Sequence, residues 1–345
     1  MINTLIVDDS SLARDIIRDF LEGDESFKII GEAADGEEGV QKILSLNPDL
    51  VTLDIEMPKM TGLEVIETVM KKTSVPIVVI TSHDTAKTAY EATLRGALEF
   101  YAKNTFTMSL TPEKRREIYE TLKRISGVKA RMSTAFFDLE TSVPVEPTLI
   151  KQPENRKIDA VVIASSTGGP KALSRFFSLL PGNFPVPIAI VQHNSTGFDK
   201  SFAQWLDTFS ALNVKLAEEG EILKPGTVYI AQTDKHMELC MAGGQMSLCY
   251  NDDEPEQNQK PAADVLFRTA AESLKRSVIS VVFTGMGSDG AAGTQKIKEM
   301  GGITLAQDEE SSLIYGMPKA AAETGCVDMV LPLDKIPAEL VRLVQ

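Results

Sequence analysis

Two neighbouring serines stand where a short apolar segment turns into a helical pattern, and this setting suits a nucleophile. The apolar segment that starts at Ile158 ends at Ser165 and Ser166, and then two glycines and Pro170 lead into KALSRFFSLL. An apolar run closed by turn residues predicts a buried strand, and proline suits the first position of a helix. Backbone N–H groups at a helix N-terminus can receive a developing negative charge. An N-capping serine after an ordinary strand is the alternative interpretation.

A serine nucleophile needs a base, and the chain contains three histidines. His193 directly follows the strand-like segment VPIAIVQ, whereas His83 lies in the first half of the chain and His236 follows another strand-like segment. Parallel strands end at one sheet edge, so we expect His193 beside Ser166. Asp289, in the glycine-rich turn of VVFTGMGSDG, offers a carboxylate to the imidazole, and a backbone N–H there can stabilise an oxyanion.

Other interpretations of these segments stay open at this point. Residues 285–290, GMGSDG, match the dinucleotide fingerprint GxGxxG, and Asp308 follows at about the place of a ribose-binding acid. That interpretation leaves the serine and the histidine at two other strand ends unexplained. A solitary histidine at a strand end is otherwise usually a surface residue. The common α/β-hydrolases are disfavoured, because their GxSxG turn is missing and the order here is serine, histidine, aspartate.

A second group of residues that could do chemistry lies near the start of the chain. Asp8 and Asp9 end one strand-like segment and Asp54 ends another, so the three carboxylates should meet at one sheet edge. Such a cluster suits a hard divalent cation, and Mg²⁺ with oxygen ligands fits. Thr81 and Lys103 end two further segments and add a hydroxyl and a positive charge. Together these groups suit a phosphoryl group on a carboxylate, although a single aspartate there would be an ordinary helix cap.

Two alternating series of strands and helices must position these residues. The strands predicted in the first series are 4–9, 27–33, 50–55, 76–82 and 98–103, and a last helix runs from Thr111 to about residue 124. The second series resumes at Ile158, with further strands at 186–192, 227–231, 278–284 and 303–306 and a hairpin around MELCMAGGQMSLCY. Alternation at this spacing predicts a doubly wound parallel sheet in each series. We expect α/β domains at 1–125 and 157–345, joined by a linker over 126–156 that is partly ordered through Phe136 and Phe137.

Composition limits the classes of function that need to be considered. The chain has 345 residues, enough for about two domains, and a formal net charge of −14 with interspersed charges. This balance disfavours nucleic-acid binding, which needs a basic face. No apolar run approaches a membrane span, and the start MINTLIVDDS does not resemble a signal peptide. Cys240, Cys249 and Cys326 form no CxxC pair, so we expect isolated reduced thiols in a cytoplasmic, monomeric protein.

The first series resembles the receiver domain of response regulators, which has a flavodoxin-like fold. The resemblance rests on VDD (7–9), LDIEMPKMTG (53–62), TS (81–82) and FYAK (100–103). It implies that Asp54 accepts phosphate from a histidine kinase. It also implies that Mg²⁺ binds Asp9, Asp54 and the Glu56 carbonyl with Asp8 nearby, and that Thr81 and Phe100 form a switch pair beside Lys103. Asn104 departs from the proline that most members of the family have there.

The second series resembles the Rossmann-like catalytic domain of chemotaxis-type protein-glutamate methylesterases. The matching motifs are IASSTGGP (163–170), VQHNSTGF (191–198), ADVLFRTAA (263–271), VVFTGMGSDG (281–290) and AQDEESSLIYGMPKAA (306–321). The family serine precedes a threonine, which implies that Ser166 is the nucleophile. It further implies the base His193, its partner Asp289, an oxyanion-binding N–H at Met286, and Thr167 and Gln192 lining the site. Asn194-Ser195 and the segment IAQTDKH depart from the family pattern.

The two resemblances together imply a phosphorylation-activated serine hydrolase that demethylates glutamate methyl esters of chemoreceptors and deamidates their glutamines. They imply that the unphosphorylated receiver packs over the Ser166 cleft. The expected partners are a chemotaxis histidine kinase and methyl-accepting chemoreceptors, with no nucleic acid, no membrane insertion and no cofactor at the esterase site. A phosphorylation-switched binding protein with an inactive esterase site is the alternative. A DNA-binding output is opposed by the acidic balance of the chain.

Overall fold

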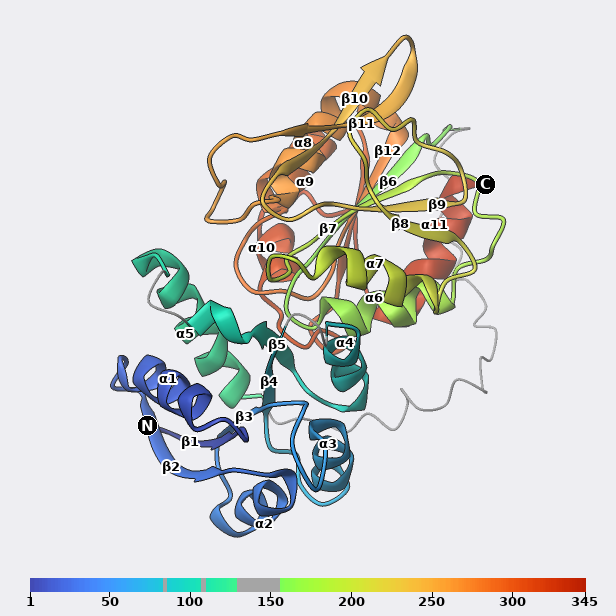
Figure 1. Cartoon of the computed structure of the whole chain (residues 1–345). Coiled ribbons are helices and arrows are strands. Elements are labelled where there is room, and N and C mark those ends of the chain that lie inside the picture. The colour runs from blue at the N-terminus through green and yellow to red at the C-terminus, as the bar shows by residue number, and fades with distance from the viewer. Residues whose placement is uncertain (83–85, 107–109, 129–155) are drawn as a thin grey trace. The chain divides into compact units, whose positions relative to one another are not determined.

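The chain forms two compact units, Met1–Ala135 and Phe136–Gln345. A computed structural model of the whole chain describes residues 1–82, 86–106, 110–128 and 156–345 (Figure 1). Most of the predicted linker over 126–156 lies outside the described residues, and so do Phe136, Phe137 and His83. The domain limits predicted from the sequence remain predictions.

In its described part, the first unit contains a five-stranded parallel sheet in the order β2-β1-β3-β4-β5. Its strands are β1 (Ile2–Val7), β2 (Phe27–Ala33), β3 (Leu50–Leu53), β4 (Ile77–Thr81) and β5 (Glu99–Ala102). Its helices are α1 (Ser11–Glu22), α2 (Gly36–Leu46), α3 (Gly62–Met70), α4 (Ala86–Arg95), α5 (Pro112–Ser126) and the 3-10 helix η2 (Lys103–Phe106). The predicted flavodoxin-like fold is confirmed.

Local signals explain where the helices of this unit begin. Thr61 and Glu64 form a capping box at the start of α3, in which each side chain accepts from the backbone N–H of the other residue. Thr111 caps α5 by accepting from the Lys114 N–H, and Pro112 follows at the first turn, as predicted. All four residues of β3 are buried, which is the pattern of a central strand covered on both faces.

The second unit is built on a larger sheet, with the order β14-β13-β12-β6-β7-β9-β8 among the described residues. Its strands, which pair in parallel, are β6 (Ala160–Ser165), β7 (Ile188–Gln192), β8 (Asn213–Leu216), β9 (Thr227–Ile230), β12 (Val278–Val282), β13 (Ile303–Gln307) and β14 (Met329–Leu331). Its helices are α6 (Gly169–Ser178), α7 (Asp199–Asp207), α8 (Ala263–Leu274), α9 (Ala291–Glu299), α10 (Met317–Glu323) and α11 (Ile336–Val344), with 3-10 helices η4 (Lys275–Ser277) and η5 (Leu333–Lys335).

The core of the second unit lies between its sheet and helices that include α8. Leu266 and Phe267 of α8 are fully buried and cluster with strand residues such as Val162, Val191 and Val282. The edge strands β8 and β14 of this sheet are not among the strands predicted from the sequence. Both are short, and each pairs with a described strand on one side only. Their side chains are therefore partly exposed, and their sequences lack the apolar run that is typical of a central strand.

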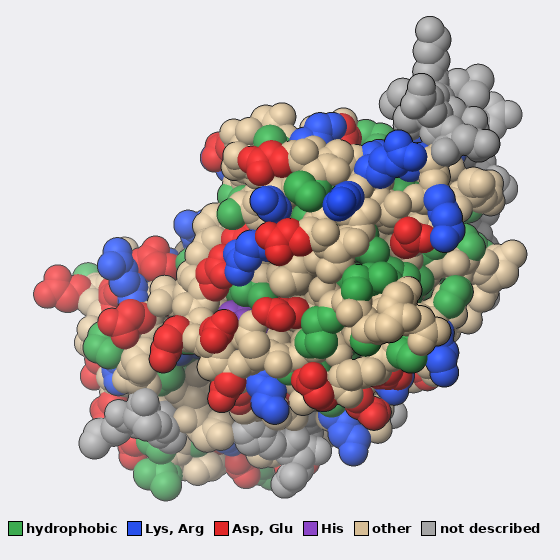
Figure 2. Space-filling view, turned by 90° about the horizontal axis from the view of Figure 1, so that it is seen from above, with side chains coloured by type: hydrophobic (Ala, Val, Ile, Leu, Met, Phe, Trp, Pro, Cys, Tyr) green, Lys and Arg blue, Asp and Glu red, His purple; other side chains and the backbone are tan. Residues whose placement is uncertain are grey.

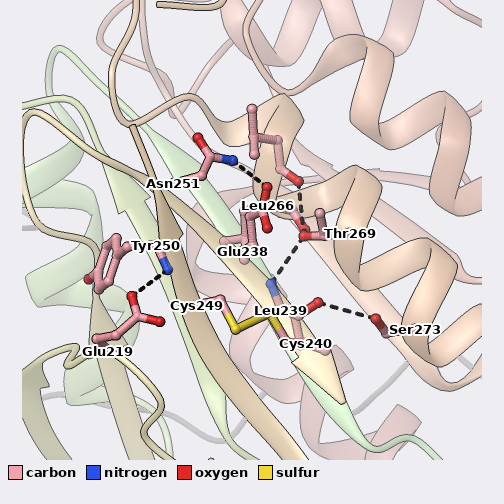
Figure 3. Close-up of a disulfide and its surroundings, with 11 residues drawn as sticks. Glu219, Glu238, Leu239, Cys240, Cys249, Tyr250, Asn251, Leu266, Thr269 and Ser273 are labelled. Atoms are coloured by element: carbon pink, nitrogen blue, oxygen red, sulfur yellow. Dashed lines mark hydrogen bonds between the residues drawn. A yellow bond between two sulfur atoms is a disulfide. The ribbon is translucent and has the colours of Figure 1, made fainter. Parts of the chain in front are cut away.

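A separate two-stranded hairpin, β10 (His236–Ala242) and β11 (Gln245–Asn251), corrects the prediction about the cysteines. Cys240 lies opposite Ser247, so it is the diagonal neighbour of Cys249 on the same face of the ribbon. The two sulfurs form a disulfide, and Cys326 is free (Figure 3). The prediction of isolated reduced thiols is therefore wrong for this pair, because the turn at residues 243–244 folds the two cysteines onto each other.

The hairpin is also tied to α8. The Leu239 N–H donates to Thr269 Oγ1 at 3.1 Å, and Ser273 Oγ donates to the Leu239 carbonyl at 3.1 Å (Figure 3).

Acidic and basic side chains are interspersed on the face of the molecule in Figure 2, as they are along the sequence. No helix in the described part of the chain combines the length and the apolar character that crossing a bilayer requires.

Candidate active site

Ser165 and Ser166 lie where β6 ends, and the structure gives them different surroundings. Ser165 is the last residue of β6 and is fully buried, and its Oγ donates to Gln192 Oε1 at 2.7 Å. Ser166 is half-buried, and its N–H donates to the Thr284 carbonyl at 3.1 Å. The chain then turns through Gly168, whose φ of 78° favours glycine, into α6. Of the two hydroxyl groups, the one of Ser166 is therefore the more accessible.

The side chains of His193 and Asp289 contact each other. His193 follows β7 directly, Asp289 follows β12, and these strands flank β6 on its two sides. His193 Nε2 lies 2.8 Å from Asp289 Oδ2, with side-chain exposures of 10% and 3%. His193 Nδ1 is buried and has no hydrogen-bond partner among the described residues. A proton held on Nε2 by the carboxylate leaves Nδ1 as an acceptor.

The Asp289 carboxylate is held in its ionised form by the N-terminus of α8. Oδ2 accepts from the Ala263 N–H at 2.7 Å, and Oδ1 accepts from the Asp264 N–H at 2.8 Å. Burial alone would raise the pKa of Asp289. The hydrogen bond and charge of His193 and the two N–H groups outweigh that effect, so the pKa lies below its usual value.

Gln192 connects the serine turn to the histidine. Its Nε2 donates to the carbonyls of Ser166 at 3.1 Å and His193 at 2.9 Å, while Ser165 holds its Oε1. Gly169 packs on this amide so closely that any Cβ at position 169 would collide with Gln192 Oε1. The side-chain amide of Gln192 thus links the backbone of Ser166 to that of His193 by hydrogen bonds.

The turn that carries the predicted oxyanion donor, Met286, approaches Ser166 in space. A Cβ added at Gly285 would come within 2.8 Å of Ser166 Cβ, so this glycine allows the turn after β12 to approach the serine. Met286 is the next residue and is partly buried. Thr167 is buried, and its carbonyl accepts from Thr284 Oγ1 at 3.0 Å.

The other histidine and the other acid considered from the sequence make hydrogen bonds within the fold. His236 is buried, with Nε2 against the Glu254 carbonyl and Nδ1 accepting from the Ala262 N–H at 3.1 Å. Asp308, the candidate ribose-binding acid, accepts from Ser311 Oγ at 2.6 Å. Asp264 is the residue that sequence reasoning missed. It is fully buried in the first turn of α8, and the available signal was a carboxylate at the start of the family motif ADVLFRTAA.

The first unit gathers its predicted carboxylates at one sheet edge. Ligand atoms of Asp8, Asp9 and Asp54 all lie within 4.8 Å of one another, and Asp8 and Asp54 are buried while Asp9 is exposed. Lys103 Nζ contacts Asp8 Oδ2 at 2.8 Å and Asp54 Oδ2 at 2.7 Å. Burial and repulsion by Asp54 raise the pKa of Asp8 above its usual value, although Lys103 opposes both effects. A set of hard oxygen donors with uncompensated repulsion is typical of a Mg²⁺ site.

The remaining receiver candidates lie on β4, on β5 and in the segments that follow β3 and β5. Thr81 ends β4 and is fully buried, and Phe100 on β5 packs edge-to-face on Tyr90 with ring centroids 4.8 Å apart. Glu56 is exposed, and a ligand role of its carbonyl remains a prediction. Asn104, the departure from the family pattern, does not displace Lys103 from the acids.

Known proteins resemble both units. The family model described as CheB methylesterase matches residues 161–340, and that of the response regulator receiver domain matches residues 4–111. The chain is 40% identical over 349 residues to a protein-glutamate methylesterase/protein-glutamine glutaminase of Pyrococcus abyssi, covering 100% of this chain and 94% of the relative. It is 40% identical over 347 residues to the protein of the same name from Thermotoga maritima, covering 100% and 99%. The crystal structure of the Thermotoga maritima CheB methylesterase catalytic domain matches with 46% identity and a TM-score of 0.54, covering 55% of this chain and 100% of that one.

Proposed function

The chain belongs to the CheB-type protein-glutamate methylesterase/protein-glutamine glutaminase family, with an N-terminal receiver and a C-terminal methylesterase domain, and we propose that Ser166, His193 and Asp289 are its catalytic triad. The observation that carries this proposal is the buried 2.8 Å contact between His193 and Asp289, at the ends of the two strands that flank the strand of Ser166. The proposed substrates are methylated glutamates and glutamines of chemoreceptors.

The proposed reaction is an acyl transfer in two steps. Ser166 Oγ attacks the ester carbonyl carbon, and its proton passes to His193 Nδ1, while the Nε2 proton stays on the ring and donates to the ionised Asp289 carboxylate. The tetrahedral intermediate collapses, and methanol leaves with the proton from Nδ1. Water then attacks the acyl-enzyme with His193 again as base, which releases the glutamate and restores the serine. An amide substrate releases ammonia in place of methanol.

The N–H of Met286 is the proposed donor to the oxyanion. The close approach of Gly285 to Ser166 supports this role, because it brings the next peptide near the carbon that the serine attacks. Gln192 and Thr167 line the site and hold its backbone. Removing one oxyanion donor costs about 10²–10³ in kcat in other acyl-transfer enzymes, and a backbone donor is lost only by moving the turn.

In the receiver, Asp54 is the proposed phosphate acceptor, with a histidine kinase as donor. Asp8, Asp9, Asp54 and the Glu56 carbonyl would hold Mg²⁺, which when bound neutralises charge on the transferring phosphoryl group. Lys103 is already paired with Asp54 and would contact the same phosphoryl oxygens. Thr81, the last residue of β4, and Phe100, on the neighbouring strand β5, are the proposed switch pair that responds to the phosphate.

We further propose that the unphosphorylated receiver restrains the esterase and that phosphate on Asp54 relieves the restraint. Deleting the receiver should then raise the basal rate of methanol release. An unchanged rate in a folded catalytic domain would argue against restraint while leaving the esterase assignment intact.

The direct test of the esterase is Ser166→Ala on receptor membranes that carry labelled methyl groups. Release of labelled methanol should fall by at least ~10⁴-fold, since the nucleophile is lost. Ser165→Ala is the matched control, because it removes the neighbouring hydroxyl and keeps Ser166; it should lower methanol release far less, through the loss of the bond to Gln192. Undiminished methanol release by Ser166→Ala would refute the assignment. Release that is absent from the wild-type protein as well would favour a phosphorylation-switched binding protein.

A further inference from the structure

Two helices of the catalytic domain begin side by side, and each lacks a cap of its own. Neither Ala262 before α8 nor Gly290 before α9 caps its helix with a side chain. Instead, Asp289 at the end of the turn that leads into α9 accepts the first N–H groups of α8. The acid of the proposed triad is therefore also the N-cap of a neighbouring helix.

A second carboxylate completes the arrangement in the opposite direction. Asp264, in the first turn of α8, accepts from the Gly293 N–H of α9 at 2.6 Å through Oδ1. Its Oδ2 accepts from Gln257 Nε2 at 2.6 Å, and Gln257 Oε1 accepts from Ser288 Oγ at 2.6 Å. Asp264 is fully buried, and both of its oxygens accept hydrogen bonds, which is the pattern of an ionised carboxylate.

The two helices touch where these bonds form. A Cβ added at Gly293 would collide with Phe267 and would lie 3.2 Å from Asp264 Cα. The turn that carries Asp289 is therefore fixed at both of its ends: through Ser288 and Gln257 on one side, and through Gly293 on the other. Both links converge on the Asp264 carboxylate.

We infer that Asp264 is a positioning residue of the esterase, which holds the Asp289 carboxylate against His193 by locking the starts of α8 and α9 together. This inference rests on the proposed role of the triad. Asp264 does not touch the reacting atoms. It acts through the hydrogen-bonded backbone of the turn and through its own negative charge, which favours a positively charged His193 during the reaction.

The Asp264 carboxyl group can gain or lose its proton slightly below neutral pH. Burial and repulsion by Asp289 raise its pKa to about 6, while the Gly293 N–H opposes the shift. The other groups that face it are Glu256 in the loop before α8, Arg268 on α8, which pairs with Glu256 at 3.0 Å, and His193 beyond Asp289. Protonation replaces one accepting oxygen by a donor O–H, so the lock should loosen as the pH falls through about 6.

The test uses the full-length protein and Asp264→Asn, which keeps the size of the side chain and removes its charge. One readout is the far-downfield NMR signal of the His193 Nε2 proton, assigned by its absence from His193→Gln. In the wild type this signal should move with an inflection near pH 6. In Asp264→Asn it should shift or broaden at neutral pH and lose the inflection. The second readout is methanol release, whose kcat should fall about 10- to 100-fold with KM unchanged.

Asp328→Asn is the matched control. Asp328 also accepts a backbone N–H, that of Thr304 at 3.0 Å, and lies in the same domain. It should lower the unfolding temperature without moving the His193 signal. If Asp264→Asn does not fold, Gln257→Ala replaces it, because Gln257 is exposed and its loss removes only one of the two bonds. The same changes, smaller, are then expected.

The outcomes separate this inference from the proposed function. An unchanged His193 signal and unchanged kcat in the folded Asp264→Asn variant would overturn the positioning role, as would an equal effect of Asp328→Asn. If Asp264→Asn shifts the His193 signal but the wild-type protein itself releases no methanol, the positioning role is supported and the esterase assignment is refuted.

Discussion

The receiver site and the esterase site occupy the same place in two sheets of the same kind, yet opposite electrostatics govern them. Each lies at the carboxyl ends of parallel strands where the strand order reverses direction, between β1 and β3 in one sheet and around β6 in the other. In the receiver, burial and repulsion leave Asp8 with a raised pKa despite Lys103. In the esterase site, Asp289 is also buried but has a lowered pKa.

The difference comes from the number of donors around each carboxylate. Asp289 accepts from two backbone N–H groups and from His193, so its charge is fully matched. Asp8 accepts from the Ser10 N–H and shares Lys103 with Asp54, so repulsion between the two acids remains. The carboxylate of the proposed triad is thus satisfied by the protein itself. The acidic cluster of the receiver keeps a repulsion between its carboxylates that a bound cation would relieve.

The largest expected effect is that of Asp289→Asn. An amide in this place keeps the shape but loses the charge that fixes the Nε2–H tautomer of His193, so kcat for methanol release should fall by about 10⁴-fold. Asp54→Asn should instead abolish the response to an acyl phosphate donor. If Asp289→Asn kept most of the activity, the hydrogen bonds and charge that hold the Asp289 carboxylate would not matter for the reaction, and the proposed contrast with the receiver acids would be wrong.

Next in size is a pair of glycine substitutions, because each site has one glycine pressed against its reacting residue. A Cβ at Gly285 would lie 2.8 Å from Ser166 Cβ, and a Cβ at Gly62 would lie 2.8 Å from Ile55 Cα and collide with the Asp54 carbonyl. Displacing a reacting group by about 1 Å costs about 10²-fold. Gly285→Ala should lower methanol release and Gly62→Ala should lower the rate of Asp54 phosphorylation, each by about that factor. Equal effects of one substitution on both assays would point to general misfolding.

A third contrast is redox-dependent stability. Both bonded cysteines lie in the hairpin of the catalytic domain, and the sequence has no cysteine before Cys240. Closing a loop of this length should stabilise that domain by about 2.5 kcal/mol. Reductant should therefore lower the catalytic-domain transition in calorimetry and leave the receiver transition unchanged. Cys240→Ser should remove the response to reductant, while Cys326→Ser, at the free cysteine, should retain it.

The smallest expected effect concerns pH and the receiver. A raised pKa in the folded state means that Asp8 favours folding at low pH and that this contribution is lost as the pH rises through the raised pKa. Asp8→Asn should thus stabilise the metal-free receiver at neutral pH by ~1 kcal/mol, or about 4 °C in Tm. Asp289 has the opposite sign, since its lowered pKa contributes stability that is lost only as the pH falls through that pKa.

Calorimetry with Mg²⁺ sharpens this last contrast. At tenfold above Kd, Mg²⁺ should stabilise the wild-type receiver by about 1.4 kcal/mol and the Asp8→Asn receiver by less. The catalytic-domain transition should not respond to Mg²⁺. Destabilisation of the metal-free receiver by Asp8→Asn would show that Lys103 outweighs the repulsion between the acids.

Much of this could be predicted from the sequence, because the decisive signals are local. Apolar runs that end in Asp8, Asp54, Ser166 or His193 mark central strands and the sheet edge where ligands bind. The alternation of strands and helices then gives the fold class, and Thr111 with Pro112 gives a helix start that the structure retains. Edge strands such as β8 and β14 carry weaker signals, since they are short and partly exposed.

The missed features depend on contacts between distant segments. The disulfide of Cys240 and Cys249 follows from the register of the hairpin, which no spacing rule for thiols predicts. The capping of α8 by Asp289 and of α9 by Asp264 requires two helices to begin side by side. A buried aspartate in the first turn of a helix looks in sequence like any favourable charge near a helix N-terminus.

The strand order around β6 has a consequence for how the protein is made. β6 pairs with β7, which follows it closely in the chain, and with β12, which is synthesised much later. The serine and histidine can therefore be assembled early on the nascent chain, while the aspartate arrives only with the last third of the sequence. Until then one edge of β6 is open for pairing with other chains, and the unfinished enzyme should be both inactive and at its most prone to aggregate.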